Sequence, residues 1–250
     1  MKCILLAAGY ATRLYPITKN YPKPLLKINN VSIIDRLCED IKKCTQIDEI
    51  IVVSNHKFIK DFNDWSDKQK DLYDVRISVL DDGSTDNDNR LGAVKDIAYA
   101  IKECNIRDDI IVMAGDNVLD FSMSGFIEYY NKYKTSCVMC YYEPSVDKLK
   151  KTGVICIEDD GKIINMQEKP EKPSSNWAVP PFYIYPSEVL ECICESVDKE
   201  GIKTDAPGEF IEWFCKEHVV YAYKMSGNRY DIGDIESYTY VDNLFKKMRE

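Results

Sequence analysis

The sequence predicts an α/β protein with a doubly wound, mostly parallel sheet in its first half and a mixed sheet in its second half. In the first half, short apolar runs without polar alternation, typical of strands buried on both faces, alternate with segments of helical apolar spacing. In the second half, strand-like segments follow one another closely. A β-α-β-α order favours a parallel sheet with helices on both faces, joined by right-handed crossovers.

Each element of the first half is located from its apolar pattern. Ser122 has the side chain and position of a helix cap. We expect, in chain order, a strand at 2–8, a helix at 31–44, a strand at 49–54, a helix around Phe58 to Trp65, a strand at 75–80, a helix at 93–104, a strand at 109–114 and a helix at 123–133.

The second half contains more strands than helices. Asp159-Asp160-Gly161 predicts a hairpin turn between two of these strands. We expect strands at 137–142, 154–158, 162–166 and 178–185, helices at 187–197 and 209–218, a strand at 219–223 and a closing helix at 235–248. No internal repeat and no Gly-, Ser- or Pro-rich linker interrupts the chain, so we expect one domain over 1–250, with halves of about 1–135 and 136–250.

Composition excludes several classes of protein. The chain has 250 residues, of which 45% are hydrophobic and 30% charged, which is too apolar for a disordered protein. No apolar run approaches the ~20 residues that a membrane helix needs. The net charge of −9 argues against nucleic acid and anionic membranes as partners, although it leaves room for a local basic pocket that binds a phosphorylated ligand.

The ten cysteines do not have the pattern of a disulfide framework. Cys137 and Cys140 have C-x-x-C spacing without a second pair, and the chain has only two histidines, so we expect no zinc site. The N-terminal apolar stretch is too short for a secretory signal. We therefore expect a cytoplasmic protein with reduced thiols. Five cysteines lie inside apolar runs, where Cys acts as a small hydrophobic residue: Cys3, Cys104, Cys137, Cys156 and Cys215.

The strongest chemical signal is the segment that follows the first strand, from Leu6 to Leu26. It begins Leu-Ala-Ala-Gly, and such small residues let backbone N–H groups approach an anion. Four cations follow within a short stretch that three prolines stiffen: Arg13, Lys19, Lys23 and Lys27. The segment is neither a Walker A motif nor a dinucleotide-binding G-x-G-x-x-G, but it predicts a phosphate site.

Two carboxylates are candidates for a metal site. Asp116 directly follows the fourth predicted strand, where ligands of open α/β sheets bind. Asp231, in Tyr-Asp-Ile-Gly, is the natural second carboxylate for Mg²⁺, which takes one or two protein carboxylates together with phosphate oxygens. Considered alone, Asp116 fits a turn as well as it fits a metal site.

Two further segments are candidates for ligand binding. Glu168-Lys169-Pro170 presents a cation after a predicted strand and fixes it with a proline, although Lys-Pro at a strand end is more often plain surface. Gly92, at the start of a predicted helix, could lie close to a planar base.

Together these motifs resemble the sugar-1-phosphate nucleotidylyltransferases, the family of the short-form glucose-1-phosphate thymidylyltransferases. The opening loop is similar to that family's L-A-A/G-G-x-G-T-R-L-x-P-x-T…P-K-P-L signature, and Gly115-Asp116-Asn117, Glu168-Lys169-Pro170 and Asp231-Ile232-Gly233 follow in the family's order. The resemblance covers about residues 2–238. It implies a Rossmann-like, GT-A-like nucleotidyltransferase fold whose mixed half covers the substrate, without a C-terminal β-helix.

The resemblance also implies a reaction and its residues. A nucleoside monophosphate would pass from a nucleoside triphosphate, dTTP or UTP, to a sugar 1-phosphate, giving an NDP-sugar for cell-surface polysaccharide and releasing pyrophosphate, with Mg²⁺ as cofactor. The implied catalytic residues are Arg13, Lys23 and Lys169. The implied nucleotide-binding residues are Leu6, Ala7, Ala8, Gly9, Thr12 and Gly92. The implied sugar-phosphate residues are Gly153, Glu168, Lys169, Val179 and Tyr183, and the implied metal ligands are Asp116 and Asp231.

Departures from the family pattern leave alternatives open. Ala11 replaces the loop's second glycine, no Gln precedes Gly92 to read the base, and Pro180-Pro181 replaces the Thr-Gly of the sugar pocket. Base, sugar and homo-oligomer formation therefore stay open. The first alternative is a cytidylyltransferase acting on phosphocholine or an aminoalkylphosphonate, whose ammonium group an aromatic cage would hold. The cage candidates are Trp177, Tyr141, Tyr142, Phe182 and Tyr183. A glycosyltransferase of related fold and a non-catalytic sensing subunit are two further alternatives.

Overall fold

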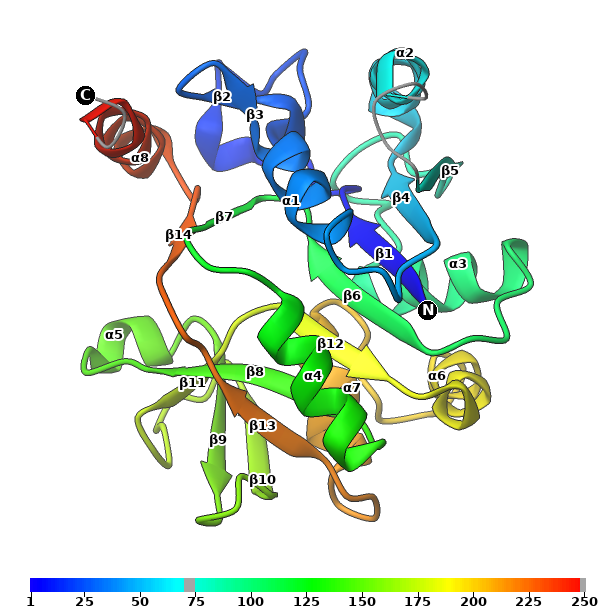
Figure 1. Cartoon of the computed structure of the whole chain (residues 1–250), viewed down its shortest axis with the longest axis vertical. Helices are drawn as coiled ribbons and strands as arrows, with labels where there is room; N and C mark the ends of the chain where they lie inside the picture. The colour runs from blue at the N-terminus through cyan, green and yellow to red at the C-terminus, as the bar shows by residue number, and fades with distance from the viewer. Residues whose placement is uncertain (70–74, 248–250) are drawn as a thin grey trace. The chain divides into compact units, whose positions relative to one another are not determined.

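The computed structural model describes residues 1–69 and 75–247, and the chain forms two compact units (Figure 1). The first unit contains 3–90, 114–123 and 227–250, and the second contains 1–2, 91–113 and 124–226. Each unit is thus assembled from segments that are distant in the sequence. The single domain expected from the sequence stays a prediction.

The first unit contains a parallel group of strands and several short elements. Its strands are β1 (Lys2–Leu6), β2 (Lys27–Ile28), β3 (Val31–Ser32), β4 (Glu49–Ser54), β5 (Arg76–Asp81), β7 (Asn117–Leu119) and β14 (Arg229–Asp231). Its α-helices are α1 (Ile33–Ile41), α2 (Ile59–Gln69) and α8 (Ile235–Lys247), and its 3₁₀ helices are η1 (Thr12–Leu14), η2 (Lys23–Leu25) and η3 (His56–Phe58).

Strands β1, β4 and β5 are neighbours in this unit, and β4 and β5 run parallel, as predicted. All six residues of β4 are buried, which explains its apolar run without polar alternation. Helix α1 is shorter than the predicted 31–44, because Val31 and Ser32 form β3. The Ser32 side chain then caps the helix by accepting a hydrogen bond from the backbone N–H of Asp35 at 3.1 Å.

Two short antiparallel ladders in the first unit were not predicted. One joins β2 to β3, and the other joins β14 to β7 with Asp231 opposite Asn117 (Figure 1). Residues from both ladders share one hydrophobic cluster with the signature loop and α8: Leu14, Leu26, Ile28, Ile33, Val118, Ile232 and Val241. The closing helix is confirmed as far as Lys247, and Met248 lies outside the described residues.

The second unit is a mixed sheet with helices. Its strands are β6 (Ile110–Ala114), β8 (Cys137–Tyr142), β9 (Gly153–Ile157), β10 (Ile163–Glu168), β11 (Trp177–Val179), β12 (Phe182–Tyr185) and β13 (Tyr221–Lys224). Its helices are α3 (Ala93–Glu103), α4 (Ser124–Tyr133), α5 (Val146–Leu149), η4 (Ser187–Val189), α6 (Leu190–Ser196) and α7 (Pro207–Phe214).

These strands follow the order β10-β9-β11-β8-β12-β6, in which each neighbouring pair runs antiparallel, and β13 runs parallel to β8. The hairpin predicted at 159–161 is confirmed, since β9 and β10 pair on either side of it. The single strand predicted at 178–185 is wrong: it is two strands, β11 and β12. Pro180 and Pro181 separate them because proline has no N–H to donate to a ladder.

The predicted α/β class, with parallel strands in the first half and a mixed second half, is confirmed. All ten cysteines lie within the described residues and are free in the structure. The expectation of a cytoplasmic protein with reduced thiols stays a prediction. Between residues 1 and 69 and between 75 and 247, no helix is both long and apolar enough to cross a membrane.

Candidate active site

The predicted site residues fall into two groups, one in each unit. The first unit holds Leu6, Ala7, Ala8, Gly9, Thr12, Arg13, Lys23, Asp116 and Asp231. The second unit holds Gly92, Gly153, Glu168, Lys169, Val179 and Tyr183. We describe each group within its own unit.

The small-residue loop after β1 is fixed by hydrogen bonds with β4 and with residues that follow β4 and β5. The Ala7 N–H donates to the Val53 carbonyl at 2.9 Å, and the buried Asn55 side chain donates to the Ala8 carbonyl at 2.9 Å. The Tyr10 hydroxyl donates to the Ser84 carbonyl at 2.9 Å. Sequence reasoning missed Asn55, whose only signal was its position directly after the second buried strand.

Gly9 and Gly115, in and near this loop, have different surroundings. A Cβ added to Gly9 would meet no atom within 4 Å, so packing within the chain does not require glycine there. The open space beside the Gly9 backbone suits an anion that approaches the loop. A Cβ on Gly115 would instead lie 3.2 Å from the Leu6 carbonyl oxygen and 3.5 Å from Pro24 Cγ, so Gly115 lets the segment before Asp116 pack on the loop.

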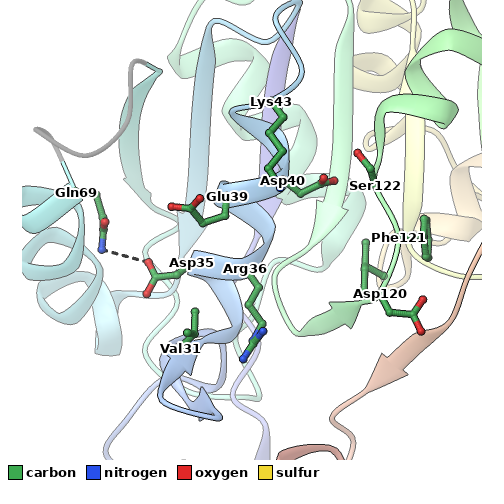
Figure 2. Close-up of a pocket in the computed structure, with 11 residues that line it drawn as sticks. Val31, Asp35, Arg36, Glu39, Asp40, Lys43, Gln69, Asp120, Phe121 and Ser122 are labelled. Atoms are coloured by element: carbon green, nitrogen blue, oxygen red, sulfur yellow. Dashed lines mark hydrogen bonds between the residues drawn. The ribbon is translucent and has the colours of Figure 1, made fainter. Parts of the chain in front are cut away.

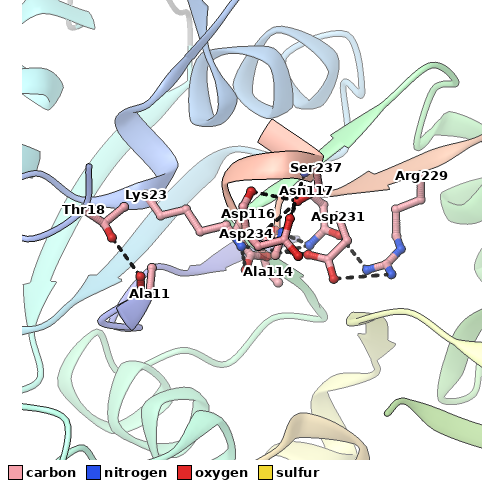
Figure 3. Close-up of polar contacts among 11 residues, drawn as sticks. Ala11, Thr18, Lys23, Ala114, Asp116, Asn117, Arg229, Asp231, Asp234 and Ser237 are labelled. Atoms are coloured by element: carbon pink, nitrogen blue, oxygen red, sulfur yellow. Dashed lines mark hydrogen bonds and ion pairs between the residues drawn. The ribbon is translucent and has the colours of Figure 1, made fainter. Parts of the chain in front are cut away.

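Ala11, which stands where the family has a glycine, adopts a left-handed conformation with φ 47° and ψ 44°. Its carbonyl accepts hydrogen bonds from the buried Thr18 hydroxyl at 2.8 Å and from the Leu14 N–H at 3.0 Å (Figure 3). The turn leads into η1, where the side chains of Thr12 and Arg13 are exposed. Alanine at this position therefore adopts a conformation that glycine adopts at lower cost.

Lys23 lies between the two predicted metal ligands. Its Nζ is 2.7 Å from Asp116 Oδ2 and 3.9 Å from Asp231 Oδ1 (Figure 3). The Lys23 side chain is only 9% exposed, whereas those of Asp116 and Asp231 are 37% and 52% exposed. Three residues that the sequence placed together by motif alone are thus adjacent in one unit.

A second cation, which sequence reasoning missed, supports the same carboxylates. Arg229 donates to Asn117 Oδ1 at 2.7 Å, and the Asn117 amide donates to Asp116 Oδ1 at 2.7 Å. Arg229 also lies 4.0 Å from Asp231 Oδ2. The pairing of β14 with β7 creates this chain of contacts, so its signal was available only after the two short strands were known.

The electrostatics keep Asp116 ionised. Burial raises the pKa of its carboxyl, but the charge and hydrogen bond of Lys23, together with the charge of Arg229, outweigh burial and hold the pKa below its ordinary value. At the edge of the loop, hydrogen bonds from the Ser237 backbone and hydroxyl lower the pKa of Asp234, and the nearby charge of Arg13 adds to this.

This donor set fits Mg²⁺. Two carboxylates supply only oxygen ligands, and they already face one positive charge, the Lys23 ammonium. No cluster of three or more His, Cys, Asp or Glu side chains with metal-binding geometry occurs in the part of the chain that the structure describes. A magnesium ion would therefore take Asp116 and Asp231 from the protein and its remaining ligands from phosphate and water.

In the second unit, three predicted residues line up across three strands. Gly153 on β9 is opposite Glu168 of β10 on one side and opposite Val179 of β11 on the other. A Cβ on Gly153 would lie 2.7 Å from Met166 Cε, 3.0 Å from Glu168 Oε2 and 3.3 Å from Val179 Cβ. Only glycine leaves room for these side chains.

Thr152 connects the two ends of this row. Its carbonyl accepts from the Lys169 N–H at 3.2 Å, and its hydroxyl donates to the Val179 carbonyl at 2.9 Å. Lys169 follows β10 with φ at +48°, a conformation that turns the chain sharply away from the strand. The Lys169 side chain is exposed.

Glu168 has a strongly altered acidity. Burial raises its pKa to about 7, against the opposing charge of Lys169 and with a smaller contribution from Glu209 and Glu212. Its Oε2 lies against Gly208 in the first turn of α7, where a Cβ would come within 2.0 Å. Sequence reasoning missed Gly208, although a glycine directly after the Pro207 that begins a helix is an unusual choice.

Gly92 and Tyr183 are not members of the Gly153 row. Gly92 precedes α3 with φ at +93°, and a Cβ there would be 2.6 Å from the Thr204 carbonyl oxygen. Packing within its own unit therefore already requires glycine. Tyr183 is only 2% exposed, lies on β12 and stacks on Tyr185 at 6.1 Å between ring centroids.

The geometry does not favour an aromatic cage. Phe182 and Tyr183 are buried. The Trp177 ring contacts Tyr142 edge-on at 5.9 Å between centroids, and the chain's own Lys224 ammonium lies 4.7 Å from the Trp177 centroid.

A separate recess of about 820 Å³ lies beside α1 in the first unit (Figure 2). Its carboxylates are bound by the chain itself: Asp35 accepts from Trp65 Nε1 at 2.8 Å and from Gln69 Nε2 at 3.2 Å, and Asp40 accepts from the Met123 N–H at 2.7 Å. None of the predicted site residues is among the described residues that line it.

The fold is α/β, and one unit holds both a lysine between two carboxylates and the small-residue loop after β1. The nucleotidyl transferase family model matches residues 2–247, and the chain belongs to that family.

Several curated relatives match this chain at 25–29% identity. The bifunctional protein GlmU of Methanocaldococcus jannaschii is 27% identical over 236 residues, covering 93% of this chain and 51% of GlmU. The UTP–glucose-1-phosphate uridylyltransferase of Pseudomonas aeruginosa is 28% identical over 267 residues, covering 97% and 95% of the two chains. The chain thus spans about half the length of the archaeal GlmU proteins that it matches.

A solved structure of UDP-glucose pyrophosphorylase with UDP-glucose has the same fold. It matches with a TM-score of 0.83 and 25% identity, covering 99% of this chain and 98% of the other.

Proposed function

We propose that this protein transfers a nucleoside monophosphate from a nucleoside triphosphate to a sugar 1-phosphate, giving an NDP-sugar and pyrophosphate. The observation that carries the proposal is the position of Lys23 between Asp116 and Asp231, in the unit that also holds the small-residue loop. A lysine and two carboxylates beside an anion-binding loop suit a reaction in which negative charge moves between phosphates.

The reaction is an in-line displacement. A phosphate oxygen of the sugar 1-phosphate attacks the α-phosphorus, and the bond from that phosphorus to the pyrophosphate oxygen breaks. No covalent intermediate on the protein is required. The N–H groups around Gly9 and the side chains of Arg13 and Lys23 hold the triphosphate and neutralise the charge that develops on pyrophosphate.

Asp116 and Asp231 hold Mg²⁺ in this proposal. When bound, the ion withdraws charge from the phosphate oxygens and orients them. The chain's contribution is to keep the Asp116 carboxyl ionised and to place Asp116 and Asp231 around the same lysine.

The second unit binds the sugar phosphate. Lys169 supplies an exposed cation for the phosphate. Glu168 and the backbone at Gly153 and Val179 contact the sugar. With a pKa of about 7, the Glu168 carboxyl can donate as well as accept a hydrogen bond near neutral pH.

The relatives favour particular substrates within this class. The Pseudomonas aeruginosa relative is a UTP–glucose-1-phosphate uridylyltransferase, and the matching solved structure contains UDP-glucose. We propose UTP or dTTP as the nucleotide and a hexose 1-phosphate as the acceptor. The product would supply cell-surface polysaccharide from the cytoplasm.

The test is pyrophosphate release from a matrix of triphosphates against several sugar 1-phosphates and phosphocholine, with and without a chelator. We expect release with a pyrimidine triphosphate and a sugar 1-phosphate, and loss of activity in the chelator. Release with CTP and phosphocholine alone would replace the proposal by the cytidylyltransferase alternative, and no release with any pair would overturn it.

Two variants test the division of roles between the units. Arg13→Ala should lower turnover by about two orders of magnitude, since one charge contact in the transition state is lost. Lys169→Ala should weaken the binding of the sugar phosphate and leave triphosphate affinity nearly unchanged. Lys172→Ala, which removes an exposed cation three positions further on, is the matched control. Loss of triphosphate binding in Lys169→Ala would show that the roles are wrongly assigned.

A further inference from the structure

Lys23 occupies the place where the proposed metal ligands converge. Its ammonium is within hydrogen-bond distance of Asp116 and within ion-pair distance of Asp231. We infer, on the basis of the proposed function, that Lys23 is the internal counter-ion of the metal site. Its ammonium pairs with both carboxylates while no triphosphate is bound. A divalent cation therefore binds there only after a triphosphate has drawn the lysine away.

The distances make the two cations competitors. Mg²⁺ binds oxygen at about 2.1 Å. An ion at that distance from Asp116 Oδ2 can lie no farther than about 5 Å from an ammonium that is 2.7 Å from the same oxygen. Because the Asp116 side chain is only partly exposed and that of Lys23 is nearly buried, water screens this repulsion poorly.

The charge balance of the site also disfavours a free metal. Asp116 and Asp231 carry two negative charges, and Lys23 and Arg229 carry two positive charges within the contact distances described above. The four side chains are therefore neutral as a group. A divalent ion gains little attraction unless one of the cations moves away.

Of these two cations, Lys23 is the one that can change partner. Its backbone is fixed in η2 between Pro22 and Pro24, but its side chain reaches the carboxylates through a flexible four-carbon stem that can adopt other rotamers. Arg229 remains tied to Asn117, which in turn binds Asp116 (Figure 3). A triphosphate at the neighbouring loop offers Lys23 several phosphate oxygens in exchange for its carboxylates.

Metal and triphosphate should then bind with positive coupling, and the coupling must be reciprocal. The structure thus assigns to Lys23 a role before the reaction begins, in addition to the charge neutralisation that we propose for it during transfer.

The test measures Mn²⁺ binding to the whole protein without nucleotide, from the electron paramagnetic resonance signal of free Mn²⁺. Wild type should bind weakly. Lys23→Met removes the ammonium and keeps the length of the side chain, so it should bind Mn²⁺ at least tenfold more tightly. The tight binding should disappear when Asp116→Asn is added. Lys27→Met, which removes an exposed cation from the same segment, should bind as wild type does.

Several results would overturn the inference. One is equal Mn²⁺ affinity in wild type and Lys23→Met. Another is tight Mn²⁺ binding by wild type without nucleotide that disappears in the single variant Asp116→Asn. This comparison does not use Lys23→Met, so it decides the matter even if Lys23→Met does not fold. Absence of Mn²⁺ binding in a folded Lys23→Met protein would also exclude it. The proposed function fails separately, through the pyrophosphate assay.

Discussion

The altered acidity of Glu168 predicts a pH-dependent effect of Glu168→Gln on stability. The carboxyl has an ordinary pKa of 4.5 in the unfolded chain and about 7 in the folded one, so the folded protein holds the proton to higher pH. The contribution of Glu168 to wild-type stability should therefore fall as pH rises from 4.5 through 7, because ionising Glu168 is costlier in the folded state. Glutamine has no proton to lose and escapes this cost.

The shift sets the size of the effect. Each pKa unit corresponds to about 1.4 kcal/mol, so the free energy of unfolding of Glu168→Gln relative to wild type should rise by about 2–3 kcal/mol between about pH 5 and about pH 8. The assay is urea unfolding of both proteins at each pH, followed by circular dichroism. Glu171→Gln, at an exposed position on the same segment, is the control and should show little change. A difference between Glu168→Gln and wild type that does not depend on pH would refute the reasoning.

Two backbone positions give further predictions, each measured by urea unfolding. Gly92→Ala should lower the free energy of unfolding by at least about 2 kcal/mol. The added Cβ would lie 2.6 Å from the Thr204 carbonyl oxygen, and alanine would be strained at the positive φ of this position. Gly201→Ala, where φ is +84° but no atom lies within 4 Å, should cost only about 1 kcal/mol, and equal losses would contradict the packing argument. Ala11→Gly should stabilise the protein by roughly 0.5 kcal/mol, since glycine is unstrained in the left-handed region. Ala100→Gly, inside α3, should instead destabilise it by about 1 kcal/mol or more, and a loss of stability in Ala11→Gly would show that the turn is not strained.

The longer elements could be predicted from the sequence because their own residues encode them. The four consecutive apolar residues of β4, from Ile50 to Val53, indicate a strand buried on both faces, and α1 has both an apolar face and a capping Ser32. The motif residues Lys23, Asp116 and Asp231 could likewise be grouped before their geometry was known.

The missed features depend on pairing between distant segments. Strands β7 and β14 have three residues each, too few to show a period, and they exist because Asn117 to Leu119 meets Arg229 to Asp231. The same holds for Gly208, whose small size matters only because Glu168 lies against it. Local sequence patterns do not predict contacts between segments that are this distant in the chain.

The two glycines around Glu168 have a consequence for how the packing around this side chain can change by mutation. A Cβ at Gly153 and a Cβ at Gly208 would each lie 2.7 Å from the same atom, Met166 Cε. Both would also contact Glu168 Oε2, at 3.0 and 2.0 Å. A substitution at either glycine displaces the same two side chains, so the second substitution meets a site that the first has already rearranged. The effects of the two substitutions are therefore not additive, and the order in which they arise decides which intermediate proteins remain stable.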